Sequence, residues 1–271
     1  MGGAVSDGKS TVQSAAKTFA VLRAFSPERA ELTLTEVAGL AGLDRGTSFR
    51  LVHTLVSLGY LAAVPATRRF RLTLKCLDLG FVALAGGGLK GMATPLLREL
   101  VPDQADAASL GMLEGADVVY VERVQSDMGR RDLERRVGSR TGAYGAALGH
   151  VLLAWLPAEE ARGILDSADR VALSEHTLTD LDTLCARLDD VRHRGYAISD
   201  GENAYGLRTI AAPILDTDGR PRAGVSLTVR SERMPLDTLI AGSLPPLQRV
   251  TAALTAALHQ TSTASSVRRA G

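Results

Sequence analysis

The chain has 271 residues, of which 45% are hydrophobic, 23% charged and 4% aromatic, and its formal net charge is +1. This composition is typical of a globular protein and excludes a disordered or fibrous one, and the length predicts about two domains. The sequence contains no run of about 18 apolar residues, so we expect no membrane partner. Residues 1–10 lack the pattern of a signal peptide, which favours a cytoplasmic location. Cys76 and Cys185 stand alone and form neither a disulfide framework nor a zinc ligand set.

Charge is distributed unevenly along the chain. Residues 1–75 carry ten basic and five acidic side chains, a net charge of +5, whereas the remainder has 21 basic and 25 acidic ones, a net charge of −4. This imbalance indicates that the first part of the chain binds a polyanion and that the second part has a different task.

Three helices are predicted within the first 60 residues. The first covers residues 11–25, and the apolar stripe expected to be buried consists of Val12, Ala15, Ala16, Phe19, Leu22 and Phe25. Thr33 stands three residues before Glu36, the spacing of a capping box, and begins a short second helix that ends at Gly42. Asp44 is the predicted cap of a third helix that reaches Leu58. Two helices joined by so short a turn are typical of a helix-turn-helix.

Strands and a linker follow the third helix. Residues 60–64 and 69–72 are predicted to form a hairpin, the wing of a winged helix, and residues 73–84 a helix that Gly86 to Gly88 interrupt. Strand-like segments then alternate with helical ones, at 108–113, 117–124, 208–215 and 223–229 and at 149–156, 179–195 and 239–258 respectively. Turns at Glu114-Gly115 and Asp218-Gly219 predict antiparallel pairing. We therefore predict an α+β chain, with a winged helix-turn-helix over residues 11–72, a linker helix over 73–88 and a sheet domain over 89–260.

The outward face of the third helix is the candidate DNA reader. Its inner side is expected to hold Ser48, Leu51, Val52 and Leu55, while Gly46, Phe49, Arg50, His53 and Ser57 point away. In the major groove Arg50 can bind guanine and Phe49 can contact a thymine methyl, and Gly46 permits close approach. Positions expected to contact phosphates are Arg45 and Thr47 at the helix start and Arg68 and Arg69 on the wing. The alternatives are a solvated face on a protein-docking module and, for Phe49, packing on the wing.

Six segments of the chain form a recognisable series. They are VQSAAKTFAVLRAF, LTLTEVAGLAGLDRGTSFRLVHTLVSLGYL and RRFRLT in the first half, then VVYVERV, VRHRGYAISDGENAYGLRTIAAPILD and AGVSLTV in the second. Together they resemble the IclR family of bacterial regulators, and the resemblance covers residues 11–258. It implies a GAF-like effector-binding domain, a homodimer or dimer of dimers on a palindromic double-stranded DNA operator, and control of catabolic genes by a small organic acid effector. The opening segment is most similar to the branch that governs aromatic-acid and β-ketoadipate catabolism.

Three segments depart from the family pattern. The recognition helix has Gly46 where a serine is usual, Ser48 where an apolar residue is usual and Phe49 where a polar one is usual. The family's proline-containing entry and small-residue lysine turn are replaced by residues 142–150, in which Leu148 is expected to reduce the cavity. The acidic pair ahead of Gly206 is replaced by residues 199–202.

The resemblance implies an effector pocket lined by Ala147, Leu148, Gly149, Thr209, Ser226 and Thr228. Ser226 and Thr228 are two residues apart and so share one face of a strand, and the amides of a helix start attract a carboxylate. Without the resemblance, the two side chains would be read as the solvent face of a half-buried strand. The stretch that contains Arg130, Arg131, Arg135, Arg136 and Arg140 is interpreted as a solvated hairpin, with anion binding as the alternative.

Other classes of function have less support. The chain contains no nucleophile elbow, no phosphate loop and no His or Cys pair at metal-ligand spacing, so we expect no enzyme, no metal site and no cofactor. His150 and His193 lie in helical patterns, where structural or surface roles are expected. A metal- or protein-responsive regulator, a sensor-fold enzyme and a protein-docking adaptor remain the alternatives.

Overall fold

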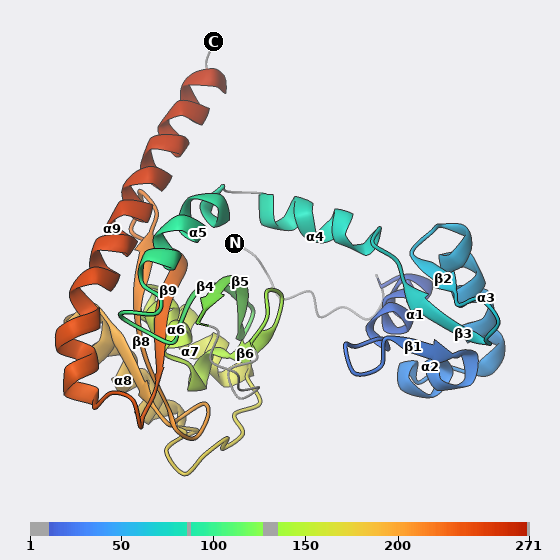
Figure 1. The fold of residues 1–271 in the computed structure, drawn as a ribbon, viewed down its shortest axis with the longest axis horizontal. Helices are drawn as coiled ribbons and strands as arrows, with labels where there is room; N and C mark the ends of the chain where they lie inside the picture. The colour runs from blue at the N-terminus through green and yellow to red at the C-terminus, as the bar shows by residue number, and fades with distance from the viewer. Residues whose placement is uncertain (1–10, 86–87, 127–134, 270–271) are drawn as a thin grey trace. The chain divides into compact units, whose positions relative to one another are not determined.

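The computed structural model describes residues 11–85, 88–126 and 135–269, and the chain divides into two compact units, 1–86 and 87–271 (Figure 1). The elements of the first unit are α1 (Gln13–Arg23), β1 (Glu31–Thr33), α2 (Leu34–Ala41), α3 (Arg45–Ser57), β2 (Leu61–Ala63), β3 (Arg69–Leu72) and α4 (Cys76–Ala85). Its three strands form an antiparallel sheet in the order β1-β3-β2, so the predicted wing hairpin is present and gains a third strand.

Caps define the two central helices of the first unit. The Thr33 hydroxyl accepts the amide of Glu36, while the Glu36 carboxylate accepts the amide of Thr33 at 2.7 Å, which completes the predicted capping box. The helix α2 ends at Gly42, whose φ of 65° lies in the left-handed region. Asp44 caps α3, as predicted. The short connection between α2 and α3 is therefore set by the left-handed backbone of Gly42 at one end and by the side-chain cap of Asp44 at the other.

Only the later part of the predicted apolar stripe of α1 is buried. Phe25 enters the core and Leu22 packs against it, together with Val21 and Ala24, whereas Val12 and Phe19 are exposed, the latter by 53%. At 100° per residue, the stripe from Val12 to Phe19 lies on the side of the helix opposite Val21. The stripe prediction is therefore wrong for its first four residues, because the core contacts only the end of α1 and the residues just after it.

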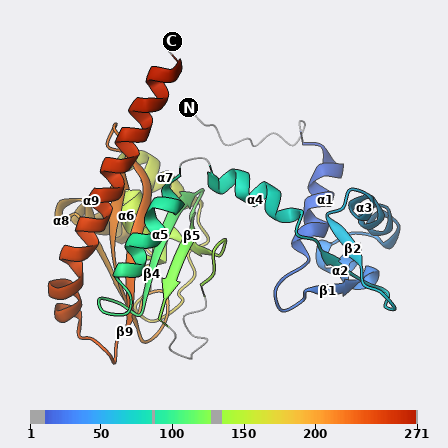
Figure 2. The same ribbon diagram turned by 45° about the horizontal axis from the view of Figure 1, so that its top comes forward.

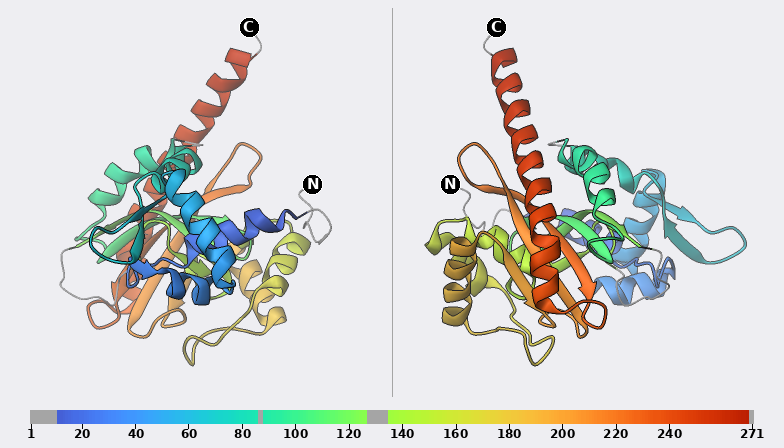
Figure 3. Two further views of the ribbon diagram at one scale, coloured as in Figure 1. Left: turned by 90° about the vertical axis from the view of Figure 1, so that its right-hand side faces the viewer. Right: turned by 60° about the vertical axis from the view of Figure 1, so that its left-hand side comes forward.

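The second unit is built on a six-stranded antiparallel sheet with the order β6-β5-β4-β9-β8-β7. Its elements are α5 (Leu89–Glu99), β4 (Ala107–Glu114), β5 (Asp117–Gln125), β6 (Arg140–Gly142), α6 (Ala147–Ala154), α7 (Ala158–Ser167), α8 (Leu181–Arg194), β7 (Ala197–Asp200), β8 (Leu207–Leu215), β9 (Pro221–Arg230) and α9 (Leu236–Arg269). Figures 2 and 3 show α5 and α9 on one side of the sheet, and α6 packs on the other with α7 and α8 beside it.

The expected α+β architecture is confirmed. The four predicted strands correspond to β4, β5, β8 and β9, and the two predicted turns have Gly115 and Gly219 in the left-handed region. The short strands β1, β6 and β7 and the helices α5 and α7 were not predicted. Within the described part of the chain, no helix combines the length and the apolar character that a membrane crossing requires.

Candidate functional site

The helix α3 has one buried and one exposed side. Ser48, Val52 and Leu55 are buried against the core, and Phe49, Arg50 and His53 are exposed, in agreement with the predicted faces. The ring of Phe49 lies 4.2 Å from that of His53, which in turn lies 6.1 Å from Phe70 on β3. Phe49 remains 51% exposed. The outward face of α3 therefore presents an arginine beside an aromatic row that runs towards the wing.

The start of α3 is occupied by its own cap. The Asp44 carboxylate accepts the amide of Thr47 at 2.8 Å, and hydrogen bonds from the Thr47 side chain and amide hold the pKa of Asp44 below its usual value. A Cβ at Gly46 would lie 3.3 Å from the same carboxylate. The Asp44 carboxylate thus already accepts a backbone amide at the start of α3. The side chains of Arg45 and Thr47 remain the predicted phosphate contacts at this end.

The two predicted arginines of the wing have different surroundings. Arg68 is exposed in the turn between β2 and β3. Arg69 turns back onto its own domain, where it donates to the carbonyl of Glu31 at 2.9 Å and forms an ion pair with Glu36 at 3.4 Å. Its guanidinium thus joins the wing to the start of α2, so Arg68 is the wing cation better placed for a DNA phosphate.

Ser48 is the departure from the family pattern that affects the core. Its hydroxyl is fully buried and has no hydrogen-bond partner among the described residues. A buried hydroxyl without a partner costs about 1–3 kcal/mol of stability. The apolar residue usual at this position would avoid that cost.

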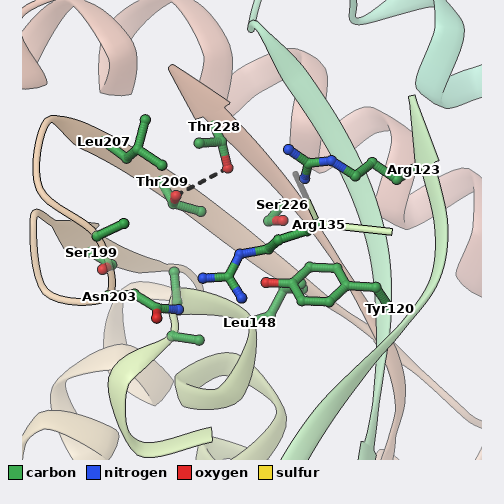
Figure 4. A pocket seen from close by; sticks show the side chains of 13 residues that line it. Tyr120, Arg123, Arg135, Leu148, Ser199, Asn203, Leu207, Thr209, Ser226 and Thr228 are labelled. Carbon is green, nitrogen blue, oxygen red and sulfur yellow. Dashed lines mark hydrogen bonds between the residues drawn. The ribbon is translucent and has the colours of Figure 1, made fainter. Parts of the chain in front are cut away.

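The second unit contains a pocket on the side of the sheet that α6 covers (Figure 4). Its cavity volume is about 60 Å³, which is room for a small molecule, since a cavity needs about 10–15 Å³ to hold one water. The walls come from β5, β7, β8 and β9, the start of α6, the loop after β7 and the segment before β6. The lining residues are Tyr120, Arg123, Arg135, Ala146, Ala147, Leu148, Ser199, Asn203, Ala204, Leu207, Thr209, Ser226 and Thr228.

Five of the six predicted effector residues line this pocket. Ser226 and Thr228 on β9 are only 3% and 8% exposed, so they do not form a solvent face. The hydroxyls of Thr228 and Thr209, on the paired strand β8, lie 3.0 Å apart. Ala147 and Leu148 contribute the start of α6. The structure thus brings together residues that are separated by about 80 positions in the sequence.

Gly149, the sixth predicted residue, does not line the pocket. A Cβ at this position would clash with the backbone of Ala143, so the glycine lets α6 pack closely on the preceding turn. Leu148 is accommodated in a similar way. Its two methyl groups lie where Cβ atoms of Gly111 and Gly224 would come within 3.0 Å, and the missing side chains leave space for it.

Five polar lining residues were not predicted, and two of them, Tyr120 and Arg123, lie on β5. Tyr120 and Arg123 are three residues apart, which on a regular strand would place them on opposite faces. A bulge in the pairing of β5 with β4 adds one residue between them on this strand. Both side chains therefore lie on the same face and reach the pocket. Arg123 donates to the Ser109 hydroxyl at 2.8 Å. Burial lowers the pKa of Arg123 and raises that of Tyr120.

The arginine-rich stretch is not simply a solvated hairpin. Arg130 and Arg131 fall outside the described residues, but Arg135 lines the pocket, with its guanidinium 5.3 Å from the centre of the Tyr120 ring. Arg136 is exposed, and Arg140 forms an ion pair with Asp117 at 3.3 Å across the β5–β6 edge. The interpretation is therefore wrong for Arg135.

The histidines do not form a shared site in the described parts of the chain. His150 is fully buried, and its Nε2 lies 2.6 Å from the carbonyl of Tyr144, whereas His176 and His193 are exposed. Burial lowers the pKa of His150 to about 4, so its ring is neutral at pH 7. Among residues 11–85, 88–126 and 135–269, no cluster of three His, Cys, Asp or Glu side chains could hold a metal ion.

Comparison with known families agrees with this two-part arrangement. The model for the bacterial transcriptional regulator IclR C-terminal region matches residues 82–257, and the model for the IclR helix-turn-helix domain matches residues 14–65. The chain belongs to the IclR family. As an IclR-type protein it is a DNA-binding transcription regulator.

Similar proteins cover most of the chain. The transcriptional regulator KdgR of Escherichia coli strain K12 is 34% identical over 80% of this chain and 82% of its own. The Pca regulon regulatory protein of Pseudomonas putida is 32% identical over 86% and 80%. Among solved structures, a putative transcriptional regulator of Rhodococcus sp. RHA1 is 36% identical, with a TM-score of 0.79 over 92% of this chain and 98% of its own.

One similar structure carries a ligand. An IclR homolog of Microbacterium hydrocarbonoxydans complexed with 4-hydroxybenzoate is 24% identical, with a TM-score of 0.76 over 90% of this chain and 98% of its own. At 24% identity, this similarity shows that the two proteins share a fold.

Proposed function

We propose that this IclR-type protein binds an operator through α3 and that a small organic acid in the pocket of the second unit modulates that binding. The proposal rests on one observation above all. Ala147, Leu148, Thr209, Ser226 and Thr228, taken from two strands and a helix start, line one polar pocket in a unit that does not contain the recognition helix. A ligand-binding site and a DNA-binding face on separate units are what a ligand-controlled regulator requires.

The DNA-binding part of the proposal assigns different tasks to two sets of residues. Arg50, with Gly46, Phe49 and His53 beside it on the exposed side of α3, reads base edges in the major groove. The cations Arg45 and Arg68 bind phosphates and so position the helix. A protein that binds the chromosome in this way acts in the cytoplasm.

The pocket supports binding rather than turnover of the acid. Its walls supply the hydroxyls of Thr209, Ser226 and Thr228 and the start of α6, which together suit the oxygens of a small ligand. We assign the protein to the control of catabolic genes. The aromatic-acid branch is one candidate, because the Pca regulon regulatory protein is 32% identical to this chain. KdgR is 34% identical, so sequence identity does not select one branch. We therefore base the class of effector on the residues that line the pocket.

We infer that the protein works as a homodimer, alone or as a dimer of dimers. One recognition helix contacts too few base pairs to select a site in a genome, and a palindromic operator needs two. Exposed apolar side chains on α1 and α4, among them Phe19 and Val82, offer a surface for this association within the first unit.

Calorimetry and a gel shift test the proposal together. The gel shift uses the intergenic DNA upstream of the protein's own gene and a panel of small aromatic, hydroxy and keto acids, and calorimetry measures which acids bind. In the variant with Ser226→Ala and Thr228→Ala, the loss of two hydrogen bonds of about 1 kcal/mol each should weaken acid binding at least about tenfold. A control variant with exposed Ser167→Ala on α7 should bind normally.

Three results would contradict the proposal. Failure to bind the upstream DNA would remove the DNA-binding role and favour a docking adaptor. Equal acid affinity in wild type and double variant would place the pocket elsewhere. Chemical conversion of the bound acid would show an enzyme.

A further inference from the structure

Arg135 places a positive charge inside the pocket, beside the uncharged residues to which the proposed function assigns the ligand contacts. The close-up view shows its guanidinium pointing into the middle of the pocket, between the Tyr120 ring and Asn203 (Figure 4). It lies over the Tyr120 ring and makes a side-chain hydrogen bond with Tyr120, and no carboxylate is found among the described residues that line the pocket. A guanidinium in this position is available to a ligand.

The lining residues that the structure describes are cationic overall. They include two guanidiniums, those of Arg123 and Arg135, and no aspartate or glutamate. The charge of Arg135 contributes to the lowering of the Arg123 pKa, although burial is the larger cause. An anionic group bound at Arg135 would offset this repulsion.

The opposite wall of the pocket has a different character. Thr209 and Thr228 share a hydrogen bond of 3.0 Å, so one of their two hydrogens is already donated and only one is left for a ligand. Such a pair can accept as well as donate, which suits a neutral hydroxyl or keto oxygen. A carboxylate gains more from a guanidinium, which offers two parallel charge-assisted hydrogen bonds.

We propose that Arg135 is the residue that binds the effector's carboxylate, and that the Thr209–Thr228 pair binds a neutral hydroxyl or keto oxygen of the same molecule. The effector class is then a short hydroxy- or ketomonocarboxylate, of a size that a cavity of about 60 Å³ can hold. This inference rests on the proposed function, and it deepens that function by assigning an orientation to the ligand and a selectivity to each wall.

The probes are small acids that differ in one group. Calorimetry on the full chain compares lactate, pyruvate, 3-hydroxybutyrate and acetoacetate with butyrate, which lacks the second oxygen, with succinate, which has a second carboxylate, and with 1,3-butanediol, which has none. Wild type should bind at least one hydroxy or keto acid more tightly than butyrate, succinate and the diol.

Variants test the contributions of the two walls of the pocket separately. Arg135→Gln should weaken the preferred acid by about ten- to hundredfold, and Arg135→Lys should restore part of the loss, because it restores the charge. Thr228→Val should reduce the preference for that acid over butyrate while leaving butyrate binding nearly unchanged. Exposed Arg136→Gln, one residue away, is the matched control and should bind as wild type does. Melting temperatures measured without ligand verify that each variant is folded.

The outcomes distinguish this inference from the function on which it rests. Equal acid affinity in wild type and Arg135→Gln would overturn the role of Arg135 while leaving the effector pocket in place. Preference for succinate would overturn the proposed class in favour of a dianion, and equal binding of butyrate would remove the role of the hydroxyl pair. If none of these probes binds the wild type but an aromatic acid of the wider panel does, the proposed effector class is wrong and the effector pocket stands. If no acid of either set binds, the effector half of the proposed function is wrong as well.

Discussion

Arg50 and Arg68 are exposed arginines of the same DNA-binding unit, but they occupy positions that should affect DNA binding differently. Arg50 lies in the middle of α3, beside the aromatic pair Phe49 and His53, whereas Arg68 lies in the wing turn. Arg50→Ala should therefore cost about 1–3 kcal/mol of discrimination between operator and random DNA. Arg68→Ala should weaken the binding of operator and of random DNA alike. It should also reduce the slope of log K against the logarithm of the salt concentration by about one.

Fluorescence anisotropy titrations at several salt concentrations measure both effects. Arg69→Ala is an informative comparison, because its guanidinium is held by Glu31 and Glu36, and this variant should lose domain stability as well as affinity. If Arg50→Ala and Arg68→Ala reduced operator and random-DNA binding in the same proportion, Arg50 would not be a base-reading residue.

His150 predicts a specific pH dependence of stability. Burial lowers its pKa from 6.5 to about 4 in the folded protein, so the unfolded state takes up a proton first as the pH falls. The free energy of unfolding should keep this contribution above about pH 6.5 and lose it progressively towards pH 4, by up to about 3 kcal/mol. Above that range the contribution should be constant.

Urea unfolding of wild type and His150→Gln between pH 7.5 and 4.5 tests this prediction. The variant should be less stable at pH 7.5, because its packing differs, but it should show a shallower decline as the pH falls. His193→Gln, at an exposed position on α8, serves as the control. Parallel curves for wild type and His150→Gln would show that another group causes the decline.

At the residue scale, the sequence correctly predicts features that depend only on the spacing between nearby residues. The Thr33 and Glu36 capping box and the Asp44 cap depend on a local spacing, and both are present. Tyr120 and Arg123 were not predicted as lining residues, because a bulge in β5 changes which side chains share one face of the strand. No local sequence pattern indicates that bulge. Arg135 was missed because a run of mixed charges has the same composition whether one of its arginines turns inward or not.

At the element scale, α1 shows why an apolar stripe does not identify a buried face. Phe25, from the predicted stripe, enters the core with Val21 and Ala24, while Val12 and Phe19 of the same stripe are exposed. The stripe is apolar along its whole length, and only tertiary packing decides which part of it is buried. The short strands β6 and β7 were missed for a related reason, since strands of three or four residues at the edges of a sheet have too few positions for a clear alternation.

The exposed side of α1 gives a prediction about assembly. If Phe19 is buried between two copies of the first unit, Phe19→Glu should weaken self-association by at least about thirtyfold, the equivalent of about 2 kcal/mol for one buried phenyl group. Sedimentation at micromolar concentration should show a dimer or tetramer for wild type and smaller species for the variant.

The matched control for this experiment is Leu173→Glu, at an exposed apolar position of the second unit. It should sediment as wild type does. A monomeric wild type, with and without operator DNA, would contradict the proposed homodimer, and an unchanged Phe19→Glu variant would place the contact on another surface.

At the scale of the whole molecule, the proposed DNA-reading face and the proposed acid-binding pocket lie in different compact units. The acid can control transcription only if the two binding events are coupled, and thermodynamic linkage then requires each ligand to change the affinity of the other by the same factor. Typical couplings of this kind correspond to about 5–150-fold changes in affinity.

The most direct test of this account is therefore the operator affinity measured by fluorescence anisotropy with and without a saturating concentration of the acid that calorimetry identifies. The wild-type affinity should change by about 5–150-fold, in either direction. The variant with Ser226→Ala and Thr228→Ala should need at least about ten times more acid for the same change. An acid that binds the pocket but leaves the operator affinity of the wild type unchanged would contradict the account.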